Sequence, residues 1–391
     1  MMLSIKLAYR NLVGAGLRTW LNVIVLSIVF ILIIWHYGVI DGWNLQAKRD
    51  MKTWEVGNGQ YWQKNYDPYD FFTLEESHAK LPDALKDAAS KGIGAPILIH
   101  QATIYPEGRM QSILLKGIEP GQHALAIPTE ALNVNIQEIP IVIGTRMARN
   151  CKLEVGDITT IRWRDIHGTF DAAEVKVVKI FSCNVPNVDA GQAWIPIQKL
   201  QEMIQAPGEA TIFVIGEDQE MSEEIKGWKY QDLDVLMLEM DEMIKMKRVG
   251  GSFLYLVLIL LAMLAIFDTQ VLSVFRRQKE IGTYIALGMT RPQVVSLFTV
   301  EGGMHAILAV IVGSIYGLPF LRWQMKTGFE MPAGTDDMGL AAAETIIPAY
   351  GAGLIITTML LIIIITTIVS YMPARKISKM NPTEAIKGKL Q

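Results

Sequence analysis

The stretch IIPAYGAGLIITTMLLIIIITTIVSYM, from Ile346 to Met372, carries no charged residue over 27 positions. A helix needs about 20 consecutive apolar residues to cross the hydrocarbon core of a bilayer. Three further stretches meet that length, namely Thr19 to Ile40, Ser252 to Phe275 and Val294 to Phe320. One such run could be a buried helix of a soluble core, but four in one chain predict four transmembrane helices.

The composition divides the chain into two kinds of sequence. Apolar types make up 51% of the 391 residues and charged types only 19%, and mixed-polarity sequence is concentrated in residues 41–247. The net charge of −3 offers no basic surface, so we expect no nucleic-acid partner. Two cysteines, Cys151 and Cys183, are too few for a disulfide scaffold or a structural zinc site. Their separation in sequence does not show whether they can form one bridge.

The basic residues predict the orientation of the helices. Residues 1–18, 276–293 and 373–391 together hold 12 basic and 2 acidic residues, whereas the rest of the chain holds 24 basic and 37 acidic residues. Cytosolic connections carry the excess of Lys and Arg. We therefore expect both termini and the 276–293 connection in the cytosol, and residues 41–247 and the 321–345 loop on the other side. No small-x-small cleavage site follows the first apolar run, which favours an uncleaved anchor over a signal peptide.

Residues 41–247 alternate between short β-type runs and amphipathic helical patterns. This predicts an α+β domain of two lobes, inserted between the first and second membrane helices, with the division near Gly117–Gln122. The expected strands are Pro96–Tyr105, Gln111–Ile118, Pro140–Ile143, Ile158–Arg164, Glu174–Ser182 and Thr211–Ile215. The expected helices are Leu74–Ser90, Thr145–Leu153 and Ile197–Gln205.

An aromatic-rich segment, residues 54–72, allows two interpretations. Aromatic side chains are normal in strands, so packing into the domain core is the simpler one. The other is an exposed surface that receives cargo. The residues considered for that surface are Trp54, Tyr61, Trp62 and Tyr66.

The sequence holds no recognisable catalytic or metal-binding motif. Its six histidines are scattered without ligand spacing, and no G-x-x-x-x-G-K-[ST] loop is present to bind the phosphates of a nucleotide. We expect a non-catalytic chain without a metal or cofactor of its own, and any use of ATP would lie on another chain.

The 276–293 connection carries the most informative pattern. Ile281, Tyr284, Ile285 and Met289 fall on one stripe of a helix, which predicts a short amphipathic helix that ends near Gly288. The segment Thr290-Arg291-Pro292-Gln293 then forms a capping box that begins the third span. Two roles remain open for this helix, one on the inner leaflet and the other as a docking site for a cytosolic partner.

Two acids, Asp268 and Glu301, lie within or at the edge of predicted spans. An acid is costly there and is a functional candidate by default. Both lie close to the predicted cytosolic ends, so solvation or pairing with a nearby arginine is a simpler explanation than a proton relay.

Three motifs give the chain a resemblance to the FtsX/MacB-type permeases of ABC transporters. The first is LAYRNL at residues 7–12, within a predicted N-terminal amphipathic helix over residues 1–18. The second is R-x-x-E-I-G-x-x-x-A-L-G at residues 277–288, followed by Glu301-Gly302. The third is P-A-R at residues 373–375 with N-P-T-E-A-I at residues 381–386. With the one-plus-three arrangement of spans, the resemblance covers nearly the whole chain.

The resemblance implies a permease subunit of the bacterial inner membrane that pairs with a second permease subunit, as a homodimer or a heterodimer. It also implies two copies of a cytosolic ATPase, which would bind ATP and Mg and whose closure would move the outer domain. Within the 276–293 connection, Arg276–Gly288 would be the coupling helix that contacts the ATPase. The residues assigned to that contact are Arg276, Arg277, Lys279, Glu280, Ile281, Gly282, Ile285, Ala286, Gly288 and Arg291.

Within this family, the size of the outer domain most resembles the lipoprotein-releasing permeases of the LolC/LolE kind. The implied cargo is a lipoprotein or another lipidated, amphiphilic molecule taken from membrane lipid. Two alternatives stay open: an FtsX-like signalling module that activates an envelope hydrolase, and a MacB-like efflux permease that works with a periplasmic adaptor.

Overall fold

The computed structural model describes residues 17–70, 72–330 and 345–377, without the side chains of residues 17–19, 262, 265–266, 269, 273–274 and 376–377. The predicted N-terminal helix motif at residues 7–12 and the tail from residue 378 lie outside the described residues. The chain divides into two compact units. The helical unit comprises Met1–Asn44, Ile244–Glu330 and Thr345–Gln391, and the α+β unit comprises Leu45–Met243 and Met331–Glu344.

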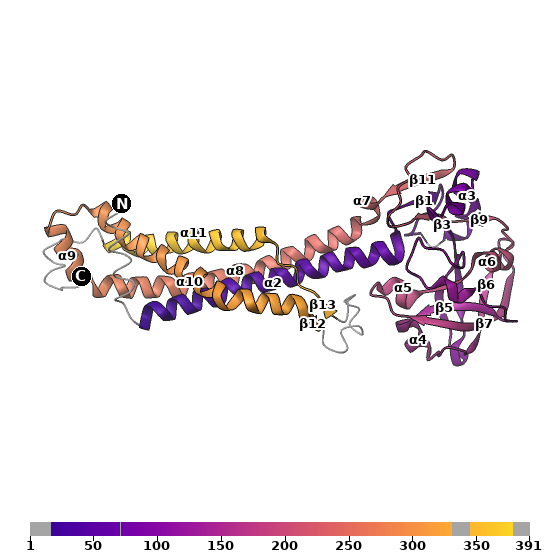
Figure 1. Ribbon diagram of the computed structural model, residues 1–391, viewed down its shortest axis with the longest axis horizontal. Coiled ribbons are helices and arrows are strands. Elements are labelled where there is room, and N and C mark those ends of the chain that lie inside the picture. The colour runs from indigo at the N-terminus through magenta and orange to yellow at the C-terminus, as the bar shows by residue number, and fades with distance from the viewer. Residues whose placement is uncertain (1–16, 71, 331–344, 378–391) are drawn as a thin grey trace. The chain divides into compact units, whose positions relative to one another are not determined.

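Four long helices form most of the helical unit (Figure 1). They are α2 (Leu17–Met51), α8 (Leu238–Arg276), α10 (Arg291–Thr327) and α11 (Ala352–Ile377). The short helix α9 (Gln278–Ala286) joins α8 to α10, and two short strands, β12 (Phe329–Glu330) and β13 (Thr345–Ile346), pair between α10 and α11. Both α2 and α8 begin or end beyond the helical unit, so each contributes residues to both units.

Three stretches of the described residues are long and apolar enough to cross a membrane. They are Trp20–Val56, Arg291–Thr327 and Ala352–Arg375, and they contain most of three of the four expected spans. The fourth expected span, residues 252–275, lies within α8, where several side chains are not described. The membrane character of the chain is thus supported, while the count of four spans stays a prediction.

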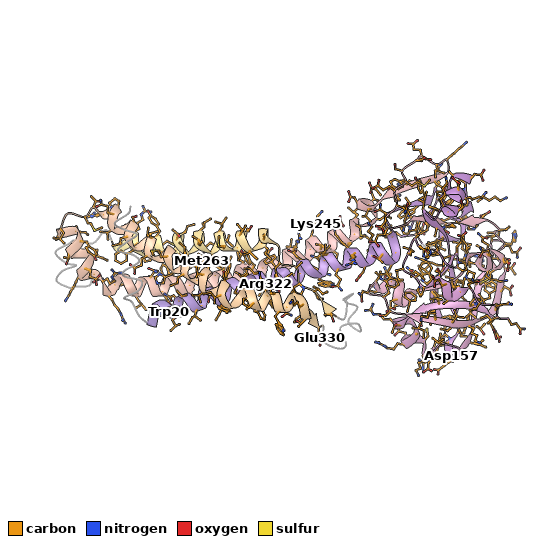
Figure 2. All side chains as sticks on the ribbon, in the orientation of Figure 1. Trp20, Asp157, Lys245, Met263, Arg322 and Glu330 are labelled. Atoms are coloured by element: carbon orange, nitrogen blue, oxygen red, sulfur yellow. The ribbon has the colours of Figure 1, made fainter. Side chains whose placement is uncertain are left out.

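The long helices pack through small residues on α10. A cluster of apolar side chains from α2, α10 and α11 fills the interior, and Met263 of α8 packs against it (Figure 2). Gly313 lies against Phe30 and Ser27 of α2, and Gly302 lies against Ser370 of α11. Because glycine has no side chain, the helix backbones approach closely at these points, as is common between membrane helices.

This packing predicts a large difference between two glycine substitutions. A Cβ atom at Gly302 would overlap the side chain of Ser370, whereas nothing lies within 4 Å of a Cβ atom at Gly353 in α11. We expect Gly302→Ala to lower the free energy of unfolding by about 1–3 kcal/mol through overpacking, and Gly353→Ala to be neutral or slightly stabilising. Thermal unfolding of the purified full chain in detergent measures both. Equal stability of the two variants would refute the close contact.

The α+β unit is built on a nine-stranded sheet. Its strand order is β11-β1-β10-β3-β4-β8-β5-β7-β6, with an additional pairing between β3 and β6. The strands are β1 (Gly59–Gln63), β3 (Gly94–Ile104), β4 (Gln111–Ile118), β5 (Ile139–Gly144), β6 (Ile158–Arg164), β7 (Phe170–Phe181), β8 (Gln192–Pro196), β10 (Ile212–Ile215) and β11 (Trp228–Asp232). Because β6 pairs back to β3, six of these strands close on themselves.

Short helices cover the sheet (Figure 1). They are α3 (Asp83–Ser90), α4 (Thr145–Cys151), α5 (Pro186–Gly191), α6 (Ile197–Met203) and α7 (Leu233–Leu236). One buried cluster joins the closed strands to α4 and α6, a second joins the loops around residues 125–132 and 181–188 to the sheet, and a third lies beneath α3. A small additional ladder pairs β2 (Ala79–Lys80) with β9 (Glu209–Ala210).

The expected strands are confirmed, with β4 and β6 at the predicted bounds. Three strands of the nine-stranded sheet, β1, β8 and β11, were not among those expected, and neither were the short strands β2, β9, β12 and β13. The expected helix Leu74–Ser90 is wrong in its first half: Leu74–Glu76 forms a 3-10 turn, Ala79–Lys80 is extended, and the α-helix starts only after Pro82. Proline lacks a backbone N–H and is tolerated only at the start of a helix.

The expected division into two lobes does not appear as a break in the sheet. The first half of β3 pairs with β10, and its second half pairs with β6, along the same edge. The strand therefore belongs both to the open part of the sheet and to the closed part. β4 ends beside the expected division at residues 117–122 and pairs there with β8, so the sheet is continuous at that point.

The two cysteines are not bridged in the structure. Cys151 lies in the cluster beside α4, and Cys183 lies in a different cluster, and both are buried. Burial raises the pKa of Cys183 to about 12. Its thiol is therefore protonated at neutral pH and is a poor nucleophile.

Candidate functional site

Helix α9 rests on the ends of α10 and α11 through its apolar stripe. Ile281 is buried in a cluster with Val294 and Phe298 of α10 and Ala374 of α11. Tyr284, Ile285 and Met289 pack against the same cluster. The predicted amphipathic helix is therefore confirmed, and its apolar face is covered by this chain itself.

The turn between α9 and α10 is closed by two capping motifs. The N–H of Gly288 donates to the carbonyl of Ile285 at 3.0 Å, and the N–H of Met289 donates to the carbonyl of Tyr284 at 2.9 Å. This is a Schellman motif, and Gly288 has the positive φ of 95° that the motif requires. The predicted capping box at Thr290 and Gln293 follows directly, with both of its hydrogen bonds present.

An ion pair ties the start of α9 to the interior of α10. The guanidinium of Arg277 donates to both carboxylate oxygens of Glu301, at 3.1 and 2.9 Å. It also donates to Glu280 at 2.8 Å and lies 5.0 Å from the centre of the Phe298 ring. Glu301 is buried and only 17% of the Arg277 side chain is exposed. The pairing of Glu301 with an arginine, one of the explanations offered by the sequence, is the one present.

The residues assigned to the ATPase contact fall into two groups. Ile281 and Gly282 are buried, and Arg277 and Ile285 are half-buried, so these four hold α9 in place. Six residues are exposed on or beside α9, namely Arg276, Lys279, Glu280, Ala286, Gly288 and Arg291. The structure adds two exposed residues that sequence reasoning missed, Thr283 and Leu287, of which Leu287 is 80% exposed. For Leu287, the sequence signal for an exposed contact was an apolar side chain at a position off the stripe.

Asp268, the second acid in a predicted span, differs from Glu301 in its exposure. Asp268 on α8 is exposed, so the helical unit does not enclose it as it encloses Glu301. The two acids are therefore not joined into one buried relay in this structure.

The ion pair makes a prediction for a double-mutant cycle. Arg277→Gln and Glu301→Gln should each destabilise the chain, because each leaves a buried polar partner without its counterion. The double variant should lose less than the sum of the two, with a coupling energy of about 1–3 kcal/mol. Thermal unfolding of the full chain in detergent gives the three values.

Glu280→Gln is the matched control for this cycle. The Glu280 side chain is 53% exposed, and exposed ion pairs typically contribute about 0.2–1 kcal/mol. Additive effects of the Arg277 and Glu301 substitutions, or an equal loss in the control, would show that the pair does not stabilise α9.

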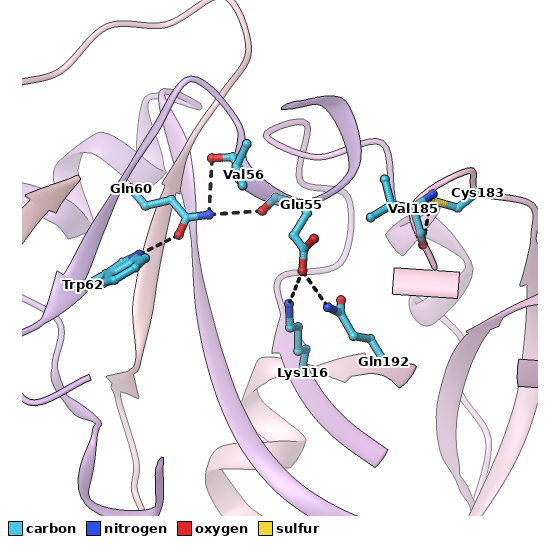
Figure 3. Close-up of polar contacts among 8 residues, drawn as sticks. All are labelled: Glu55, Val56, Gln60, Trp62, Lys116, Cys183, Val185 and Gln192. Atoms are coloured by element: carbon cyan, nitrogen blue, oxygen red, sulfur yellow. Dashed lines mark hydrogen bonds and ion pairs between the residues drawn. The ribbon is translucent and has the colours of Figure 1, made fainter. Parts of the chain in front are cut away.

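The α+β unit holds a second buried polar network, at the end of α2 (Figure 3). There the chain widens into a single π-helical turn, Lys52–Val56. The carboxylate of Glu55 in this turn accepts a hydrogen bond from Gln192 of β8 at 2.9 Å and lies 4.0 Å from the ammonium of Lys116 in β4. Burial lowers the pKa of Lys116, and the charge of Glu55 opposes that shift.

The same turn is fixed to β1 by a glutamine. The side-chain amide of Gln60 donates to the backbone carbonyls of Glu55 and Val56, at 3.1 and 3.3 Å, and accepts from the indole of Trp62 at 2.7 Å (Figure 3). π-Helical turns are rare and occur frequently at functional sites. Here the turn connects α2 to three strands of the sheet.

The aromatic segment contributes mostly to the core. Tyr61 is fully buried in β1, where burial raises its pKa to about 12. Trp62 and Tyr66 are half-buried and meet edge to face, and Trp54 stacks on Phe181. Among the described residues of the segment, the exposed aromatic residues are instead Tyr69, at 69%, and Phe72, at 95%. A cargo-binding role for Trp54, Trp62 and Tyr66 stays a prediction, whereas the Tyr61 ring does not reach the surface.

The buried lysine gives a prediction with a pH dependence. Glu55→Gln should lower the free energy of unfolding by about 1–3 kcal/mol at neutral pH, because Lys116 then stays charged in a buried site without a counterion. The Glu55→Gln/Lys116→Met double variant should recover most of that loss. An equal loss in the single and double variants would contradict the pairing.

The sign of the pH dependence follows from the lowered pKa. The folded chain releases the proton of Lys116 below the usual pKa of 10.5, so between the two values the unfolded chain binds more protons and stability rises with pH. The deficit of Glu55→Gln should therefore shrink as the pH rises through the folded-state pKa. Thermal unfolding of the full chain between about pH 7 and pH 10 measures it.

Within the described residues, no three His, Cys, Asp or Glu side chains lie together as metal ligands would. Helix α9 is packed against α10 and α11 on one side and exposed on the other.

Parts of the chain are similar to known proteins. Residues 252–382, which include most of α8, all of α9 and α10 and the described part of α11, match the family described as FtsX-like permease C-terminal. The Uncharacterized ABC transporter permease MJ1507 of Methanocaldococcus jannaschii is 24% identical over 261 residues, or 63% of this chain and 62% of that protein. The Macrolide export ATP-binding/permease protein MacB of Burkholderia cenocepacia is 25% identical over 165 residues, or 39% of this chain and 21% of MacB.

A solved structure is also similar to part of the chain. It is the extracellular domain of the noncanonic ABC-type transporter YknZ from Gram-positive bacteria, with 13% identity and a TM-score of 0.26. The similarity covers 41% of this chain and 83% of that domain. The chain aligns with less than two thirds of the length of both MJ1507 and MacB.

Residues 252–382 are an FtsX-like permease C-terminal domain. The relatives MJ1507 and MacB are ABC transporter permeases, so the chain is similar to permeases of the FtsX/MacB type. Permease subunits of this family are generally non-catalytic.

Proposed function

We propose that this chain receives a separate ATPase on the exposed face of α9 and converts ATP-driven movement of that ATPase into movement of the α+β unit. The observation that carries the proposal is the two-sided character of α9. Its apolar stripe and Arg277 fix it to α10, while Lys279, Thr283 and Leu287 face outward. A force applied to the exposed face would act on α10 directly, because the other face of α9 is packed against α10 and linked to it by the Arg277–Glu301 pair.

Two helices supply the route from the membrane to the α+β unit. Both α2 and α8 run without interruption through residues of both units. In the helical unit, Arg248 of α8 pairs with Asp41 of α2 at 3.2 Å, and Lys247 lies 3.5 Å from the centre of the Trp43 ring. In the α+β unit, Lys48 pairs with Asp241. These contacts favour joint movement of the two helices.

The proposed orientation rests on the distribution of charge, and the proposed assembly rests on the resemblance to FtsX/MacB-type permeases. The basic 276–293 connection favours a cytosolic position for α9 by the positive-inside rule, and the α+β unit would then lie outside the inner membrane. ATP and Mg would bind to two copies of the partner ATPase, and a second permease subunit would complete the pair of membrane domains.

The cargo divides the proposal into two candidate functions. Release of a lipoprotein or another lipidated cargo rests on the resemblance of the outer domain to the LolC/LolE kind. Efflux with a periplasmic adaptor is equally compatible and rests on the similarity to MacB over 39% of the chain. Signalling to an envelope hydrolase is the remaining alternative, in which the α+β unit moves but carries nothing.

The α9 contact makes a specific prediction. Leu287→Asp should greatly reduce the amount of ABC ATPase that copurifies with the tagged chain from native membranes, because it places a charge in an apolar contact. The fold should be unaffected, since Leu287 is 80% exposed. Mass spectrometry with isotope-labelled standards would quantify the ATPase, and gel filtration would check the fold.

Val155→Asp is the matched control, because Val155 is an exposed apolar residue of the α+β unit at 60% exposure. It should retain the ATPase. Recovery of equal amounts with both variants would exclude α9 as the docking site. The other proteins recovered with the unmodified chain distinguish the cargo candidates: a lipoprotein favours release, a tunnel-forming adaptor favours efflux, and an envelope hydrolase favours signalling.

A further inference from the structure

A groove of 510 Å³ lies between the first turns of α10 and the last turns of α11. Its polar residues are two arginines, Arg291 and Arg375, together with three hydroxyl-bearing residues, Tyr371, Ser296 and Thr299. Val295 contributes apolar surface. Of the residues that line the groove, Arg291 alone was assigned to the ATPase contact, and the cargo proposals use none of them.

The groove has a polar end because the two helices run in opposite directions and each brings an arginine to that end. Gly302 of α10 meets Ser370 of α11, and Gly303 meets Thr367, so the helices run antiparallel. The start of α10 and the end of α11 therefore lie at the same end of the helix pair, and each brings one arginine there. Away from that end, the groove continues toward Val295 and Thr299 and into the apolar part of the spans.

The charge of the groove selects an anion. Among the residues that the structure describes, its lining includes two guanidinium groups and no acidic residue. A guanidinium group matches the geometry of phosphate oxygens with paired N–H donors. The N-terminus of α10 adds the positive end of a 37-residue helix. The hydroxyl groups of Ser296 and Tyr371 supply further donors for oxygen atoms, whereas that of Thr299 donates to the carbonyl of Val295 at 2.8 Å.

The position of the groove selects a lipid over a soluble anion. α10 and α11 are both long and apolar enough to span a membrane, so their ends lie at the depth of the headgroups. Tyr371 is 43% exposed, and tyrosine is enriched at that depth because its ring is apolar and its hydroxyl is polar. Basic pockets between membrane helices are a known setting for anionic headgroups.

We propose that this groove binds an anionic phospholipid, with Arg291 and Arg375 on the headgroup phosphate and the hydroxyl of Tyr371 donating to phosphate or glycerol oxygens. The inference requires only that α10 and α11 span a bilayer, and it stands whether or not α9 receives an ATPase. Arg291 then contacts lipid, in place of the ATPase contact assigned to it from the sequence. Because Arg291 directly follows the capping residue Thr290, a bound lipid would steady the turn that positions α9.

The test uses the full chain, purified in detergent and stripped of lipid. Phosphatidylglycerol and phosphatidylcholine with identical acyl chains are titrated separately, and native mass spectrometry counts the bound lipids. The unmodified chain should prefer phosphatidylglycerol, and Arg291→Gln/Arg375→Gln should weaken that binding by roughly tenfold without affecting phosphatidylcholine. Arg291→Lys, which keeps the charge but loses the paired donors, should give an intermediate loss and guards against misfolding of the double variant.

Arg322→Gln is the matched control, since Arg322 is an exposed arginine of the same helix (Figure 2), about 45 Å from Arg291 at the helical rise. It should bind both lipids as the unmodified chain does. Equal affinity for the two lipids, or unchanged phosphatidylglycerol binding in the double variant, would overturn the proposal. Displacement of the lipid by millimolar inorganic phosphate would show a soluble-anion site instead. Loss of copurifying ATPase with unchanged lipid binding would assign the arginines to the ATPase.

Discussion

Glu301 lies inside a membrane-spanning helix, where a carboxylate is costly unless it is paired, and Arg277 supplies its partner from the segment before α9. Glu301 is ten residues into α10, or about 15 Å from the start of that helix. Arg277 reaches it because the chain reverses direction between α9 and α10, through a Schellman motif and a capping box. The ion pair, the two caps and the apolar stripe around Ile281 therefore all specify one position for α9.

The parts of this arrangement that depend on local sequence could be predicted. The stripe, the end at Gly288 and the cap at Thr290 follow from helical periodicity and backbone conformation, which neighbouring residues determine. The arginine partner of Glu301 could be anticipated but not identified, because Arg276 and Arg277 are adjacent and only the reversal brings one of them to Glu301. The outward position of Leu287 does not follow from the apolar stripe, because Leu287 lies off that stripe.

In the α+β unit, contacts between residues far apart in the sequence could not be predicted. Six strands were predicted from their composition, but the closure of β6 onto β3 depends on residues about 60 positions apart, which no local pattern encodes. Glu55 and Lys116 are likewise separated by about 60 residues, and no local pattern pairs them. The segment around Tyr61 was correctly suspected of core packing, because β1 lies between β10 and β11 and is covered by neighbours.

The proposed route of movement ends at α9 and at the end of α2, and a partly buried ion pair is present at both. At each, a helix terminus is held by a charge that is partly removed from water: Arg277 beside Glu301 at α9, and Glu55 beside Lys116 at the end of α2. An ion pair of this kind adds little net stability, but breaking it leaves an uncompensated charge, so intermediate arrangements are costly. Apolar contacts alone would let a helix end slide in small steps. A paired charge favours one position over its near neighbours, which is the property a helix needs if displacement at one end is to reach the other.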